Sequence, residues 1–167
     1  TLSTMIAHAK SVKLGAKRSL VVVDMPINTY NSRHIAYKNA KKIIQSTRCD
    51  AVKLEGGKKI INIIRYLIKK NIPIMGHIGL LPQSEKGKFT FKGKREAERK
   101  KIFQDAKLLS ESGVFAIVIE CVEQNLAVLY AWLIFTPIVI FVAWLLTIMV
   151  DNPAKDFAYE IDVMTRI

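Results

Sequence analysis

Five polar side chains that could take part in chemistry stand at or near the ends of short apolar runs. They are Asp24, Lys53, Glu55, His77 and Glu120. Two carboxylates with few soft ligands suit a hard cation such as Mg2+, which proteins hold through one or two carboxylates while substrate and water complete its shell. A third acid, buried behind an apolar strand, would have a raised pKa and could serve as a general base.

Each of these residues also has an ordinary structural interpretation when it is taken alone. Asp24, before Met-Pro, could be a turn or capping residue. Lys53 and Glu55 could form a surface ion pair, and His77 could be a hydrogen-bonded loop histidine. Glu120 is harder to explain in this way, because an acid that follows a six-residue apolar run is costly unless the strand opens on solvent or on a site. The joint occurrence of the five residues indicates a site.

The elements that must position these residues are strands alternating with helices. Short apolar, β-branched runs predict buried strands over residues 19–23, 51–54, 72–75 and 114–119. Amphipathic spacing predicts helices over residues 2–14, 32–46, 58–70 and 95–112, with a loop over 76–93. This alternation implies an α/β fold with a parallel sheet, either an open doubly wound sheet or a barrel. In both, the carboxyl ends of the strands share one crevice, so the five side chains should converge there.

Composition restricts the class of protein. Half of the 167 residues are apolar, and 26 Lys and Arg stand against 14 Asp and Glu, so the chain can bury a core. Cys49 and Cys121 are too few for a disulfide framework and lack zinc-ligand spacing. We interpret Cys121 as a small buried hydrophobe rather than a nucleophile. A reduced, cytoplasmic location is expected for residues 1–125, without a cleavable secretory signal.

A basic stretch at residues 86–101 holds eight Lys and Arg, with Phe89 and Phe91 interleaved. Nucleic-acid binding is therefore a rival function. The commoner role of such a run is a solvated loop and helix start, and the basic excess is spread through the predicted helices. A basic segment that covers an anionic substrate explains the cluster at least as well. Nucleic acid is thus not the expected partner.

The chain changes character near residue 126. Residues 1–125 carry 24 basic and 10 acidic side chains, whereas residues 126–167 carry 2 and 4. Residues 126–150 are 25 residues without a charge, long enough to span a bilayer, although a core helix of a soluble domain is the alternative. We predict a domain over 1–125, a long apolar helix over 126–150 as a candidate transmembrane span and membrane contact, and a polar tail over 151–167.

Several motifs, in order, resemble the ketopantoate hydroxymethyltransferase (3-methyl-2-oxobutanoate hydroxymethyltransferase) family over about residues 1–127. They are GAKRSLVVVDMP (15–26), DAVKLEGG (50–57), IPIMGHIGLLPQS (72–84), FKGK (91–94) and GVFAIVIECV (113–122). The resemblance implies a (βα)8 TIM barrel that forms homo-oligomers. It further implies transfer of a hydroxymethyl group from 5,10-methylenetetrahydrofolate to 3-methyl-2-oxobutanoate, with Mg2+, to give ketopantoate for pantothenate synthesis.

The resemblance also implies a role for each residue. Asp24 and Glu55 hold or flank the metal, Asp24, Lys53 and His77 contact the oxo acid, and Glu120 removes the C3 proton. Glu120 should then face the crevice. As a base it needs a raised pKa, whereas metal-bound carboxylates need lowered ones, so the environments should push these acids apart.

Three departures from the family pattern bear on activity. The upstream GDS motif is not found, the loop DMPFGSY reads DMPINTY, and no Gly-rich IGIGAG segment follows Ala127. We therefore expect a partial barrel of about four βα units, truncated at both ends, with impaired or no activity. Residues 126–167 are faintly similar to the C-terminus of membrane acyltransferases. The alternative function is a non-enzymatic, basic, membrane-associated module that binds anionic lipid or RNA.

Overall fold

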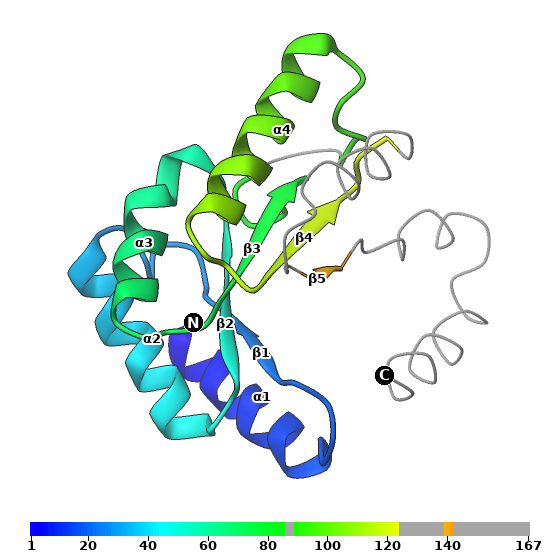
Figure 1. Cartoon of the computed structure of the whole chain (residues 1–167). Coiled ribbons are helices and arrows are strands. Elements are labelled where there is room, and N and C mark those ends of the chain that lie inside the picture. Colours follow the sequence, from blue (N-terminus) through cyan, green and yellow to red (C-terminus); the bar gives the residue numbers. More distant parts are fainter. Residues whose placement is uncertain (86–88, 124–138, 142–167) are drawn as a thin grey trace, which may run out of the picture.

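A computed structural model of the chain describes residues 1–85, 89–123 and 139–141, and its elements are parallel strands alternating with helices (Figure 1). In chain order they are α1 (Leu2–Gly15), β1 (Val22–Asp24), α2 (Arg33–Thr47), β2 (Ala51–Glu55), the 3-10 helix η1 (Lys58–Ile60), α3 (Ile61–Lys69), β3 (Ile74–Gly79), α4 (Glu96–Glu111), β4 (Ala116–Glu120) and β5 (Val139–Phe141). The strands form one sheet in the order β1-β2-β3-β4-β5, and every neighbouring pair is parallel. The described part is thus an α/β sheet that fits a partial TIM barrel.

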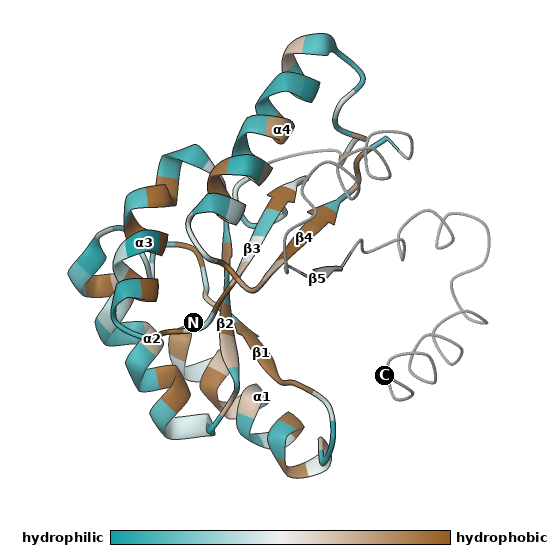
Figure 2. Ribbon diagram, in the orientation of Figure 1, coloured by the Kyte–Doolittle hydropathy of each residue, from teal (hydrophilic) through white to brown (hydrophobic). Residues whose placement is uncertain are grey.

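The hydrophobic core lies between the sheet and the helices. Helices α2, α3 and α4 stand in a row along one face of the sheet (Figure 1), and each of them carries both hydrophilic and hydrophobic residues (Figure 2). Fully buried side chains from both layers meet there, among them Ile43, Leu54, Ile64, Leu109 and Ile117. Burying such aliphatic side chains stabilises the fold by about 1.5–3 kcal/mol each relative to leaving them exposed.

The opposite face of the sheet carries the polar residues. Successive residues of a strand point to opposite faces. In β2, Val52 and Leu54 are fully buried and alternate with the half-buried Lys53. In β3, Gly76 faces helix α4, because a Cβ there would lie 2.8 Å from Leu109 Cδ1. His77, next in sequence, therefore lies on the face away from α4.

The four predicted strands are confirmed, with shifted bounds. The first begins at Val22 instead of residue 19, and β4 extends to Glu120. The predicted loop over 76–93 is wrong at its start, because β3 continues to Gly79. Glycine-rich sequence is typical of a loop, but here β2 and β4 pair with β3 on both sides and hold it extended.

Only residues 139–141 of the predicted apolar segment 126–150 are described. They form β5, which pairs with β4, so the predicted helix is wrong at these three residues. The remainder of that segment and the predicted tail over 151–167 lie outside the described residues. Within residues 1–85, 89–123 and 139–141, no helix has both the length and the apolar character needed to cross a bilayer.

Asp50 joins α1 to the start of the sheet. Its Oδ2 accepts hydrogen bonds from Lys13 Nζ and from Val21 N, both at 2.8 Å. The bond from Lys13, and then the bond from Val21, hold the pKa of Asp50 below its ordinary value of 3.8. The ionised carboxylate therefore stabilises the folded chain.

We expect Asp50→Asn to destabilise the protein at neutral pH and to lose this effect in acid. Because the folded-state pKa is depressed, the stabilisation is complete above about pH 4, the pKa of an unperturbed Asp, and falls as pH drops through the folded-state pKa. Urea unfolding of both proteins between pH 7 and pH 3 measures the difference. A difference that stays constant down to pH 3 would contradict this assignment.

Asp105 of α4 anchors the backbone that follows β2. Its side chain is buried, its Oδ1 accepts from Lys58 N at 2.7 Å, and its Oδ2 pairs with Lys101 Nζ at 2.7 Å. Gly57 leaves the space for this contact, because a Cβ there would lie 2.1 Å from Asp105 Cγ. Gly57 is therefore required because any larger side chain would collide with Asp105 of α4, a helix far away in the sequence.

We expect Asp105→Ala to lower the free energy of unfolding by about 2 kcal/mol, because Lys58 N–H loses its acceptor in a partly buried position. Urea denaturation followed by circular dichroism measures this change. Glu111→Ala, on the exposed side of the same helix, removes only a 3.8 Å pair with Lys107 and should change stability by less than about 0.5 kcal/mol. Equal effects of the two variants would refute the anchoring role.

Candidate active site at the strand ends

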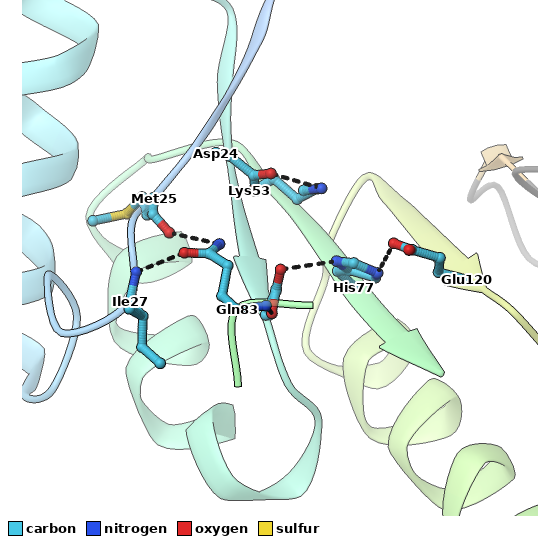
Figure 3. A network of polar contacts seen from close by, with 8 residues as sticks. Asp24, Met25, Ile27, Lys53, His77, Gln83 and Glu120 are labelled. Atoms are coloured by element: carbon cyan, nitrogen blue, oxygen red, sulfur yellow. Dashed lines mark hydrogen bonds and ion pairs between the residues drawn. The ribbon is translucent and has the colours of Figure 1, made fainter. Parts of the chain in front are cut away.

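The structure brings all five predicted site residues to one face of the sheet, at the carboxyl ends of β1 to β4. The strand register pairs Asp24 with Lys53 and Glu55 with His77, and it places Glu120 beside Gly79. Figure 3 shows Asp24, Lys53, His77 and Glu120 on neighbouring strands. The predicted convergence is confirmed as geometry, and the chemical roles stay predictions.

Asp24 and Lys53 form an ion pair across β1 and β2. Lys53 Nζ lies 2.8 Å from Asp24 Oδ2 (Figure 3), and both side chains are partly exposed. The other carboxylate oxygen, Asp24 Oδ1, is buried and has no hydrogen-bond partner among the described residues. A buried carboxylate oxygen without a donor is costly in a folded protein, so Asp24 keeps one position free for a ligand.

His77 lies between two acids and is 1% exposed. Its Nε2 is 2.9 Å from Glu120 Oε2 (Figure 3) and its Nδ1 is 3.7 Å from Glu55 Oε1, and neither ring nitrogen forms a hydrogen bond with the described residues. Burial, and next the positive charge of Lys53, lower the pKa of His77 to about 4. The imidazole is therefore neutral at pH 7 and separates the two carboxyl groups.

Burial also acts on the two glutamates. It raises the pKa of Glu120, and the negative charges of Glu55 and Asp24 add to this against the opposing effect of Lys53. The direction predicted for a base is thus confirmed. Burial likewise raises the pKa of Glu55, against hydrogen bonds from Gln83 that lower it. For Glu55 without a metal, desolvation outweighs its hydrogen bonds, and the lowered pKa expected of a metal-bound carboxylate stays a prediction.

Two further residues belong to the cluster and were missed by sequence reasoning. Gln83, in the PQS part of a quoted motif, donates its backbone N–H to Glu55 Oε2 at 3.2 Å. Tyr30 is buried, and this burial, with the charge of Glu55, raises the pKa of its phenol. Gln83 lies in the segment 72–84, which also contains His77, and Tyr30 ends the segment 24–30, which begins with Asp24. Being a polar residue close to a predicted site residue is the only sequence signal that either of them has.

The free carboxylate oxygen of Asp24 is the kind of ligand that a hard cation prefers. Among residues 1–85, 89–123 and 139–141, no group of three or more His, Cys, Asp or Glu is arranged to hold a metal. Asp24 Oδ1 is free, whereas Glu55 Oε2 accepts a hydrogen bond and Oε1 faces His77. One or two carboxylates suffice for Mg2+ when substrate and water supply its other ligands. The residues present therefore fit Mg2+ when substrate and water complete its ligand shell.

A cavity of about 370 Å3 adjoins the ion pair. Asp24 and Lys53 supply its charged part, and Val22, Met75 and Val118 from the same face of the sheet supply apolar walls. Cavities of this size accommodate small ligands. Met5, His8, Ala9 and Val12 of α1 complete the lining together with Val21 and Val23.

The basic stretch at 86–101 is largely paired with acids where the structure describes it. Lys92 contacts Glu85 at 2.7 Å and Arg99 contacts Glu123 at 2.8 Å. Lys100 and Lys101 contact acids one helical turn away on α4. These ion pairs neutralise part of the positive charge that could otherwise bind a polyanion such as nucleic acid.

The sequence of this chain is similar to those of one family of known proteins. A family model described as ketopantoate hydroxymethyltransferase matches residues 1–139. Curated proteins named 3-methyl-2-oxobutanoate hydroxymethyltransferase are similar: that of Pelagibacter ubique is 62% identical over 127 residues, covering 76% of this chain and 49% of the relative. Those of Anaplasma marginale and Phocaeicola vulgatus are 46% and 49% identical, covering 76% of this chain and 47% and 48% of the relatives.

The chain spans about half the length of the curated relatives it matches. The matched residues include every strand from β1 to β4 and all five predicted site residues. The chain belongs to the ketopantoate hydroxymethyltransferase family.

Proposed function

We propose that the chain acts on 3-methyl-2-oxobutanoate and transfers to it the one-carbon unit of 5,10-methylenetetrahydrofolate, giving ketopantoate. The observation that carries this proposal is the placement of Lys53, Asp24 and Glu120 on one face of the sheet, with His77 2.9 Å from Glu120 and a part-apolar cavity beside Lys53. The names of the relatives support the same reaction.

The chemistry requires removal of a proton from a carbon next to a carbonyl group. Glu120 takes the C3 proton, and the electron pair of the broken C–H bond forms the C2–C3 double bond of an enolate. Water hydrolyses the C–N bonds of the methylene bridge of 5,10-methylenetetrahydrofolate, which releases tetrahydrofolate and leaves the one-carbon unit at the oxidation level of formaldehyde. C3 of the enolate forms a bond to that carbon while the C2=O double bond re-forms, and the oxygen of the one-carbon unit takes up a proton to become the hydroxyl group of ketopantoate. The raised pKa of Glu120 brings it closer to neutrality, where a carboxylate is a more effective base.

Lys53 and His77 have separate parts in this proposal. The Lys53 ammonium borders the cavity and attracts the carboxylate and 2-oxo groups of the substrate. His77 is neutral and packs against Glu120, so it adds no positive charge that would lower the pKa of Glu120 and weaken it as a base. Asp24, with Glu55 beside it, would hold Mg2+. The bound metal would polarise the 2-oxo group.

We infer slow turnover for the 167-residue chain assayed by itself, because its sequence contains no GDS motif to add the further metal and substrate contacts that the resemblance implies. Proton removal needs fewer groups than the complete transfer. Exchange at C3 should therefore be the more robust activity.

The test is proton exchange at C3 of 3-methyl-2-oxobutanoate in deuterium oxide with Mg2+, followed by proton NMR. We expect the chain to accelerate exchange above the rate in buffer with Mg2+ alone. A parallel assay with 5,10-methylenetetrahydrofolate measures ketopantoate. Exchange no faster than in the protein-free control would contradict the proposed function, and ketopantoate formation at the rate of a full-length relative would contradict the inferred slow turnover.

A further inference from the structure

Gln83 makes three hydrogen bonds to two different strand-end segments. Its side-chain Oε1 accepts from Ile27 N at 2.7 Å, and its Nε2 donates to Met25 O at 3.3 Å. Its backbone N donates to Glu55 Oε2 at 3.2 Å. Figure 3 shows the side chain of Gln83 bonded to Met25 and Ile27.

The side-chain amide of Gln83 takes over the backbone hydrogen bonding that β1 has with β2, at the point where β1 ends. Met25 N donates to Lys53 O at 3.0 Å, the last bond of this segment to β2. Beyond it, Met25 O and Ile27 N are bonded by the two ends of one amide, as they would be by the backbone of a neighbouring strand. The turn that follows contains Asn28 at φ 68, a conformation uncommon for a residue other than glycine.

The backbone of Gln83 acts on the second acid. Glu55 Oε2 accepts its N–H, and this bond opposes the rise in pKa that burial causes. Gln83 therefore links the segment directly after Asp24 to the carboxylate of Glu55. Asp24 and Glu55 lie on different strands, and Gln83 follows a third, β3.

We propose that Gln83 is a positioning residue that sets the placement of Asp24 relative to Glu55 by holding the backbone at Met25 and Ile27. Its effect on cation binding rests on the proposed function, in which these two carboxylates hold Mg2+. Groups that orient metal ligands typically change metal affinity by about 10–100-fold when they are removed.

The test compares Gln83→Met with Gln45→Met. Methionine keeps the length of the side chain but can neither donate nor accept these bonds, while the backbone bond to Glu55 remains. Gln45 is an exposed glutamine of α2 whose side chain makes no hydrogen bond among the described residues, so it controls for the substitution itself. The three readouts are hydrogen exchange of the Ile27 amide by NMR, Mn2+ affinity by electron paramagnetic resonance, and the thermal midpoint.

For Gln83→Met we expect exchange of the Ile27 amide to accelerate by at least about threefold, because its acceptor is lost. Mn2+ affinity should fall about tenfold with little change in the thermal midpoint. Gln83→Glu keeps an acceptor for Ile27 N–H and should restore its protection. Gln45→Met should match the parent in every readout.

The outcomes separate the two proposals. Unchanged Ile27 exchange in Gln83→Met refutes the positioning role, whatever happens to activity. Faster exchange with unaltered Mn2+ affinity also refutes it, because the held backbone would then not matter to the two acids. If the parent binds no Mn2+, the proposed function loses its metal, and Ile27 exchange alone decides whether Gln83 holds this segment.

Discussion

Gly79→Ala is expected to lower the free energy of unfolding by about 3–5 kcal/mol. Gly79 has φ +90, where an alanine is strained by about 1–3 kcal/mol. A Cβ at Gly79 would also lie 2.2 Å from Glu120 O and 2.8 Å from Val122 Cγ2. Glu120 O cannot move freely, because it accepts from Leu80 N at 2.8 Å. Overpacking of this kind adds about 1–3 kcal/mol.

Urea denaturation at pH 7 measures this prediction. Small domains are stable by only about 5–15 kcal/mol, so much of the Gly79→Ala protein should be unfolded or lost on expression. Gly15→Ala is the matched control, because no heavy atom lies within 4 Å of a Cβ at that position. It should change stability by less than about 1 kcal/mol. A Gly79→Ala protein as stable as Gly15→Ala would show that β3 and β4 are not in such close contact.

Glu120→Gln is expected to slow C3 proton exchange by about 10²–10⁴-fold. The amide has the shape of the carboxyl group and retains the contact with His77, but it cannot accept the substrate proton. Burial of the site is unchanged, so the thermal midpoint should move little. Exchange of 3-methyl-2-oxobutanoate in deuterium oxide, measured against the parent chain, gives the ratio.

The control for Glu120→Gln is Glu123→Gln. Glu123 pairs with Arg99 at 2.8 Å near the surface and takes no part in the cluster around His77. Its variant should exchange C3 within about twofold of the parent rate. If Glu120→Gln retains exchange at a comparable rate, another group removes the proton, and Glu120 is a structural neighbour of His77.

Most of the site could be predicted because the strands and helices have local signatures in the sequence, and their alternation implies a parallel sheet. An apolar run that ends on an acid places that acid at a carboxyl strand end, and parallel pairing brings such ends together. Asp24, Glu55 and Glu120 were found in this way and lie on the same face.

The rest depends on contacts between residues far apart in the chain. Gly57 is required by Asp105 on a helix, and Gln83 reaches back to Met25 and Ile27. Neither contact has a periodic signature. The balance of burial and hydrogen bonding that raises the pKa of Glu55 depends equally on the assembled neighbours. Sequence patterns give the strand ends, and only packing gives the bonds between the loops that follow them.

Helix α4 makes two of the acids parts of one mechanical unit. It leads directly into β4, which ends on Glu120, and its Asp105 holds the backbone after Glu55 through Lys58 N. A rigid displacement of α4 would therefore shift both glutamates together. Thermal motion of the helix thus changes the distance between Glu55 and Glu120 less than independent motions of two separate loops would change it. A designer who transfers this pair of acids to another scaffold should move β2, β3, α4 and β4 as a single block, because β3 lies between β2 and β4 in the sheet.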